Sequence, residues 1–156
     1  MKQSKRTIFL TIIISVIIVF LGVYFFSYYY DFLLPGVEGT SYQVIDFNGP
    51  FLNSLFFSML LGVIPISSML TWKAARIIEL NKRVWTVVII IICVTLAIIL
   101  RYQIIKSYLI GLKKDAAQNI EIIYPVNQLN YEYYMIAGIC IGGLFSYFLF
   151  RRKKNL

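Results

Sequence analysis

The segment TIFLTIIISVIIVFLGVYFFSY, residues 7–28, decides the fold, because it contains no charged side chain in 22 positions. An α-helix rises about 1.5 Å per residue, so a helix of this length reaches about 33 Å. The hydrocarbon core of a bilayer is about 30 Å thick. The segment is therefore expected to cross a membrane as a helix.

A cleaved signal peptide is the alternative interpretation of this segment, since Lys2, Lys5 and Arg6 precede it. The apolar run is longer than the core of a signal peptide, and it ends in aromatic residues instead of the small residues of a cleavage site. We therefore expect a first span that the mature chain retains.

Three further uncharged runs occupy residues 51–72, 84–100 and 133–150. The whole chain of 156 residues is 60% hydrophobic and only 14% charged, far from the composition of a soluble domain. Backbone polar groups in lipid must be satisfied within the segment, and these runs lack the alternation of a β-barrel. The sequence predicts an all-α integral membrane protein, a bundle of four transmembrane helices forming one membrane domain over residues 1–156.

Basic residues predict the orientation of the spans. Eleven of the 15 lysines and arginines lie in the N-terminal segment, the 73–83 loop and the C-terminal tail. Six of the seven acidic residues lie in the two other connecting segments, 29–50 and 101–132. By the positive-inside rule both termini face the cytoplasm and these two segments are outer loops. The expected location is the plasma membrane, the inner membrane of a bacterium.

The composition excludes several chemistries. Histidine is absent, and Cys93 and Cys140 stand far apart within apolar runs, so we expect no metal site, no catalytic triad and no redox pair. Phosphate-binding glycine loops are also missing. The chain has a net charge of +8, but its basic residues flank the spans and do not form a stripe on a folded domain. This placement argues against nucleic acid as a partner. We predict no cofactor and no catalytic residue.

Three residues are predicted to lie at the membrane interfaces. Trp72 and Trp85 bracket the short cytoplasmic loop, and Arg101 follows the third span near the outer boundary, where its guanidinium can reach water. Apolar residues recur at helical spacing beyond Arg101. The third helix is therefore expected to continue, either projecting outward or lying along the membrane surface.

Small residues predict where helices pack. They recur at four-residue intervals in two spans: Ser54, Ser58 and Gly62 in the second, and Gly138, Gly142 and Ser146 in the fourth. Such stripes let helix backbones approach closely in lipid. We predict that the second and fourth helices are each other's preferred contacts, within one chain or between copies.

Pro65 is expected to kink the second span. It cannot donate a hydrogen bond to the carbonyl of Leu61. Ser67 and Ser68 are candidates to compensate for the disturbed helix, and a gating hinge is the functional alternative to simple bending.

The outer loops contain two short stretches, 41–47 and 119–124, with strand-like composition between turn residues. Both lie on the same side of the membrane. The sequence therefore predicts a small outer cap with a two-stranded β element, which needs support from the helices or a partner.

Three functions compete. The preferred one is a non-catalytic membrane protein that associates with another membrane component, or with itself, through its small-residue faces and outer cap. The second is a subunit of a transporter or channel, with Asn53, Ser54 and Ser58 lining a path. The third is a lipid-modifying enzyme that uses outer carboxylates, namely Glu38, Asp46, Glu121 and Glu132.

Overall fold

The computed structural model describes residues 5–37, 40–45, 50–115, 120–125 and 129–151. Within these ranges, four long helices and two short strands follow one another: α1 (Lys5–Leu33), β1 (Thr40–Ile45), α2 (Pro50–Ala74), α3 (Leu80–Asp115), β2 (Ile120–Pro125) and α5 (Tyr131–Phe150). All four helices are long and apolar enough to cross a membrane. The prediction of four apolar helices is confirmed, and they support a multi-pass membrane protein.

Apolar side chains cover the outside of the helices. Phe9, Phe20 and Tyr24 on α1 are each about two-thirds exposed or more, and every other helix carries similar residues. A soluble protein rarely leaves such continuous apolar surface in contact with water. This surface is the one that acyl chains cover when the chain lies in a bilayer.

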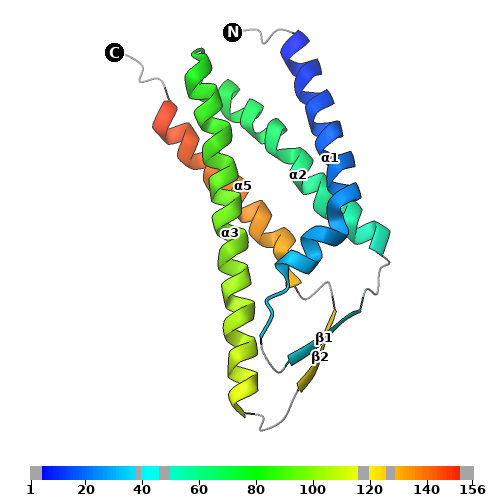
Figure 1. Cartoon of the computed structure of the whole chain (residues 1–156). Helices are drawn as coiled ribbons and strands as arrows, with labels where there is room; N and C mark the ends of the chain where they lie inside the picture. Colours follow the sequence, from blue (N-terminus) through cyan, green and yellow to red (C-terminus); the bar gives the residue numbers. More distant parts are fainter. Residues whose placement is uncertain (1–4, 38–39, 46–49, 116–119, 126–128, 152–156) are drawn as a thin grey trace.

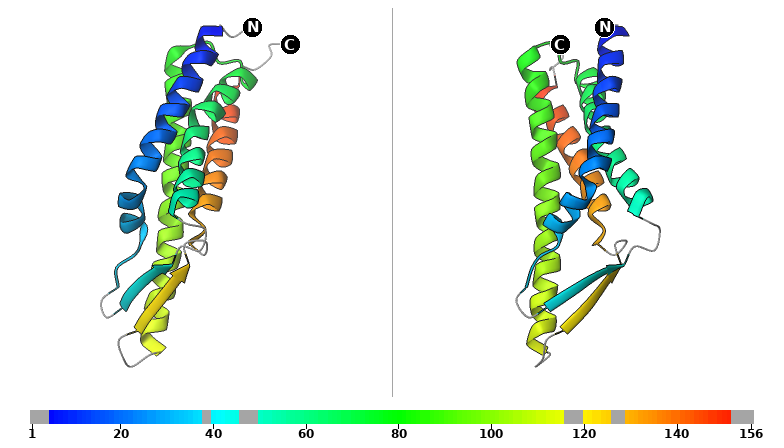
Figure 2. Two further views of the ribbon diagram at one scale, coloured as in Figure 1. Left: turned by 90° about the vertical axis from the view of Figure 1, so that its right-hand side faces the viewer. Right: turned by 45° about the vertical axis from the view of Figure 1, so that its right-hand side comes forward.

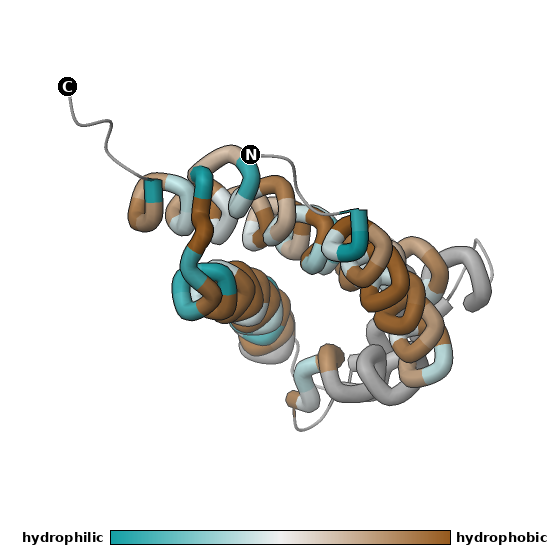
Figure 3. Tube along the Cα trace, turned by 90° about the horizontal axis from the view of Figure 1, so that it is seen from above, coloured by the Kyte–Doolittle hydropathy of each residue, from teal (hydrophilic) through white to brown (hydrophobic). Residues whose placement is uncertain are grey.

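The helices pack as two pairs. α1 runs along α2, α5 runs along α3, and α2 joins the pairs through smaller contacts with α5 and α3 (Figure 3). Within one chain, α2 and α5, the second and fourth helices, are therefore not each other's preferred contacts, and a contact between copies stays a prediction. Each of these helices packs most extensively on the helix that precedes it in its own half of the chain.

α3 is the longest helix and extends beyond the other three (Figure 2). Its 36 residues reach about 54 Å, well beyond the thickness of a hydrocarbon core. The helix runs on past Arg101 without a sharp bend, as the spacing of its apolar residues indicated (Figure 1). Segment 101–132 therefore begins as helix, and α1 likewise continues into segment 29–50.

The two strands pair in parallel, and each residue of β1 pairs with the residue 80 positions further along the chain, from Thr40 with Ile120 to Ile45 with Pro125. Each half of the chain is thus a helix, a strand and a second helix. The strands lie at the end of the molecule opposite the start of α1 and the end of α5 (Figure 1). That they form a cap over the bundle stays a prediction.

The buried core is concentrated toward the strand end. Leu109, Leu129, Tyr131 and Met135 are almost completely buried there, with Leu33 beside them. These residues belong to one hydrophobic cluster, which joins the end of α1, the later part of α3 and the start of α5.

Candidate functional site

The stripe on α2 lies against α1. A methyl group built on Gly62 would lie 2.5 Å from Cγ2 of Val19, and one on Gly22 would lie 2.8 Å from Oγ of Ser58. Ser58 is completely buried and donates a hydrogen bond of 2.6 Å to the carbonyl of Ser54. Ser58 therefore faces a helix contact and not an open path. The side chain of Asn53, the third residue of the suggested channel lining, lies outside the described residues.

The stripe on α5 lies against the backbone of α3. Methyl groups built on Gly138 and Gly142 would lie 2.7 Å from Cα of Val94 and 2.8 Å from Cα of Ile90. One turn further along, Ser146 is completely buried, and its hydroxyl has no hydrogen-bond partner among the described residues. The two stripes are thus used within one chain, each against a different neighbour.

The hydroxyl groups of the two serines that follow Pro65 donate hydrogen bonds to the helix backbone. Ser67 and Ser68 both donate to the carbonyl of Ile64, each at 2.8 Å, and not to that of Leu61. Because each hydroxyl has a single hydrogen to donate, neither serine donates to the carbonyl of Leu61 as well. A kink at Pro65 stays a prediction.

The two predicted tryptophan anchors differ in their surroundings. Trp72 is half-buried, and its Nε1 donates to the carbonyl of Arg83 at 3.2 Å, while the Arg83 guanidinium lies 5.9 Å from the centre of the Trp72 ring. Trp85, by contrast, is 58% exposed. Trp72 thus closes the α2–α3 turn, a contact that its position in the sequence did not indicate. That both tryptophans anchor the chain at an interface stays a prediction.

Arg101 is part of a polar connection at the strand end. Its Nε donates a hydrogen bond of 2.7 Å to the carbonyl of Leu129, and its guanidinium lies 5.6 Å from the centre of the Tyr134 ring. The donor and acceptor are 28 residues apart. Arg101 therefore ties the middle of α3 to the segment that leads into α5.

Tyr131 provides a second connection in the same layer. Its hydroxyl donates a hydrogen bond of 2.6 Å to the carbonyl of Leu33, at the end of α1. The last turns of α1 bend toward the start of α5 and bring this carbonyl within reach (Figure 1). We call Leu33, Arg101, Leu129, Tyr131 and Tyr134 the strand-end junction. No sequence motif predicts it, because its parts come from three distant segments.

The part of α3 beyond Arg101 has two apolar faces. Ile105 and Leu109 are buried against the core, whereas Ile104 and Tyr108 are 43% and 60% exposed. Both pairs are four residues apart, so each pair forms its own stripe along the helix. The exposed stripe of Ile104 and Tyr108 is the candidate binding site in this part of the molecule.

The described residues contain no group of three or more side chains able to hold a metal ion. Of the outer acids in the enzyme hypothesis, Glu38, Asp46 and Glu121 lie outside the described side chains, and Glu132 lies in the first turn of α5. Both cysteines are free, and Cys140 is exposed. No protein-family model, curated protein or solved structure matches this chain.

Proposed function

We propose that this chain is a non-catalytic protein of the plasma membrane, the inner membrane of a bacterium, with both termini in the cytoplasm. It acts by associating with another membrane component or with a second copy of itself. The observation that carries this proposal is the exposed stripe of Ile104 and Tyr108 on a helix that extends beyond the bundle.

The charge distribution supports the orientation. Among the described residues, seven basic side chains lie near the start of α1, in or beside the α2–α3 turn, or at the end of α5: Lys5, Arg6, Lys73, Arg76, Lys82, Arg83 and Arg151. These three places lie at one end of the molecule (Figure 1). Positive loops stay in the cytoplasm during insertion, so the strand end faces outward.

The small-residue stripes pack against other helices of the same chain, so the contact with a partner is expected elsewhere than at these stripes. The close-packing faces of α2 and α5 are covered by α1 and α3. A partner is therefore expected at the outer layer, where the projecting part of α3 presents apolar side chains. Apolar stripes at helical spacing on an unpaired helix face are a common docking element.

The strand pair is a second element of the same outer layer. A parallel sheet of two strands leaves one edge of each strand without a strand neighbour among the described elements. Small sheets of this kind are marginal in water, and open edges accept a further strand. We propose that the pair is part of a cap whose stability increases when the partner is bound.

Photo-crosslinking tests this function. A photoreactive amino acid at Tyr108 or Ile104 is expected to give one protein adduct of the same mass from both positions in intact membranes. The matched control is position 20 on α1, where Phe20 is exposed to lipid at mid-span and no protein adduct is expected. An adduct of twice the chain mass identifies self-association, and another mass identifies a different protein. Lipid adducts alone at all three positions would contradict the proposal.

A further inference from the structure

The two halves of the chain repeat one arrangement. The first unit consists of α1, β1 and α2, and the second unit consists of α3, β2 and α5, so each has a helix, a strand and a returning helix. The strands of the two units pair in parallel, 80 positions apart. α1 and α3 both run toward the strands from the opposite end of the molecule (Figure 1). The two units therefore have the same orientation.

The same spacing of 80 positions recurs in the packing of the returning helices. Gly62 of α2 lies 80 positions before Gly142 of α5, and Ser58 lies 80 positions before Gly138. Ser58 and Gly62 pack closely on α1, whereas Gly138 and Gly142 pack closely on α3. Small residues at such positions allow two helices to approach closely in lipid. The close contact thus lies at the same place in both units.

The units differ in the length of chain between this contact and the sheet. On α1 the close contact lies at Gly22, 18 positions before Thr40, the first residue of β1. On α3 it lies at Val94, 26 positions before Ile120, the first residue of β2. The second unit is thus eight residues longer in this part, which corresponds to about 12 Å of helix. This extra length explains why α3 extends beyond the other helices.

The helices approach each other more closely inside a unit than between units. Methyl groups built on Gly138 and Gly142, which face α3 of their own unit, would lie less than 3.0 Å from the backbone of that helix. Gly143 faces the other unit, and a methyl group built on it would lie 3.5 Å from Oγ1 of Thr71, an ordinary contact distance. The backbones of the two units are therefore not pressed together at this position.

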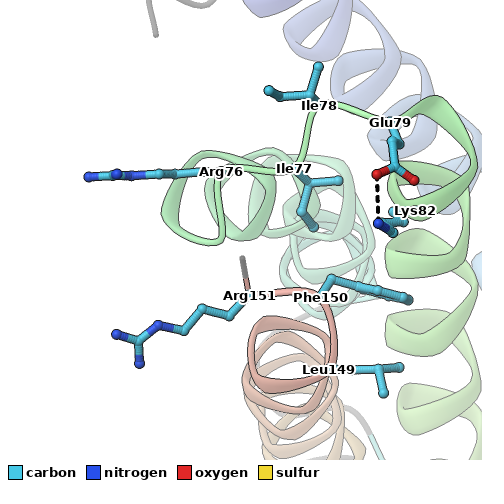
Figure 4. A pocket seen from close by; sticks show the side chains of 8 residues that line it. All are labelled: Arg76, Ile77, Ile78, Glu79, Lys82, Leu149, Phe150 and Arg151. Carbon is cyan, nitrogen blue, oxygen red and sulfur yellow. Dashed lines mark hydrogen bonds and ion pairs between the residues drawn. The ribbon is translucent and has the colours of Figure 1, made fainter. Parts of the chain in front are cut away.

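Hydrogen bonds join the units at both ends. At the strand end, β1 pairs with β2, and the hydroxyl of Tyr131 donates to the carbonyl of Leu33 at 2.6 Å. At the opposite end, Nε1 of Trp72 donates to the carbonyl of Arg83 across the α2–α3 turn. A cavity of about 320 Å³ lies between this turn and the end of α5 (Figure 4). The turn is therefore not packed closely on the last residues of the second unit.

We propose that the chain is a duplicated helix–strand–helix unit, and that each unit forms its own close helix packing and docks on the other. The docking surface of a unit is one edge of its strand together with the side of its returning helix that carries Thr71 or Gly143. The partner that fits this surface is a second helix–strand–helix unit in the same orientation. This docking is independent of the exposed stripe on α3, so it stands whether or not another molecule binds there.

A circular permutant of the full chain tests this arrangement. It begins at Glu79, ends at Ile78, and joins residues 156 and 1 by a flexible glycine–serine linker. Both units stay whole, and the new chain ends lie in the α2–α3 turn. We expect cooperative thermal unfolding in detergent micelles with a midpoint close to that of the unchanged chain, because the entropy of closing a loop changes slowly with its length. A permutant without cooperative unfolding would overturn the proposal.

Cutting the folded chain compares the two kinds of contact. One variant carries a site for a sequence-specific protease after Ile78, and the matched control carries the same site between β1 and α2, after residue 47. After cutting, a rising fraction of sodium dodecyl sulfate in the micelles separates the fragments. The two units should separate at a lower fraction than the control fragments, because the control cut separates α1 from α2, its most extensive helix contact. An equal or reversed order would overturn the proposal.

The separated second unit provides a further measurement. G138A should lower its thermal midpoint, because Gly138 packs on α3 within the unit. G143A is the matched control and should not lower it, because Gly143 faces the other unit. A second unit that loses its helical circular dichroism on separation, or an equal loss in both variants, would show that the units do not fold by themselves.

Discussion

The hydroxyl of Tyr131 donates a hydrogen bond of 2.6 Å to the carbonyl of Leu33, and the two residues are 98 positions apart. Both residues are buried. This contact joins the end of α1 to the start of α5, two helices that belong to different packing pairs. It therefore stabilises the arrangement of the pairs and not a single helix.

Replacing Tyr131 by phenylalanine should destabilise the chain by about 1–3 kcal/mol, because the buried carbonyl of Leu33 loses its donor. Thermal unfolding in detergent micelles measures the effect. Y133F is the matched control, since Tyr133 lies two residues away and is 70% exposed. Equal midpoints for the two variants would contradict a stabilising role for the hydrogen bond.

Gly138 and Gly143 should respond oppositely to alanine. At Gly138 the added methyl group meets Cα of Val94 at 2.7 Å, so backbone must move and we expect a loss of about 1–3 kcal/mol. At Gly143 the nearest atom, Oγ1 of Thr71, lies at an ordinary 3.5 Å. Alanine also favours the helix over glycine, so G143A should be neutral or stabilising by up to about 1 kcal/mol. Denaturation of both variants in the same detergent compares them, and equal effects would contradict the close approach of α5 and α3.

Replacing Arg76 by glycine should stabilise the chain by about 1 kcal/mol, because the left-handed conformation costs glycine little. Thermal unfolding of R76G and of the unchanged chain in detergent micelles measures the effect. Arg76 has a φ of 54°, so lower stability of R76G would show that its side chain contributes to the fold by more than this backbone conformation costs.

Replacing Ser146 by alanine should leave stability unchanged or raise it by up to about 1 kcal/mol. Its buried hydroxyl has no partner among the described residues, so the substitution removes a desolvation cost. S58A is the comparison, because it removes a hydrogen bond of 2.6 Å and is expected to cost about 0.5–1.5 kcal/mol. Thermal unfolding of both variants is the measurement, and a large loss for S146A would reveal a hydrogen bond to that hydroxyl.

The orientation is testable with a cysteine-free variant that carries one new cysteine. Position 108 should react with a membrane-impermeant maleimide added to intact cells, because the projecting part of α3 is expected outside. Position 76 should react only after the membrane is permeabilised. Both residues are exposed, so burial does not explain a difference. The reverse labelling pattern would invert the proposed topology.

Local pattern predicted the spans well and the helix contacts poorly. An uncharged run such as 84–100 identifies a span by its own length and composition, whatever surrounds it. A stripe such as Gly138 and Gly142 shows only that another backbone can come close. The sequence does not indicate which helix that backbone belongs to. The strand-end junction was missed for a related reason, since Arg101 and Tyr131 both donate to main-chain carbonyls, and every residue has one of these.

The number of apolar helices follows from the amino-acid sequence alone, because a bilayer selects segments one at a time by length and polarity. The same is true of the expected orientation, which depends only on where lysine and arginine occur. Tertiary structure alone decided that α2 packs on α1 and α5 on α3, and that Ile104 and Tyr108 stay exposed while Ile105 and Leu109 are buried. These outcomes depend on which helix faces pack best against one another. That comparison involves all the helices together and cannot be made from one segment at a time.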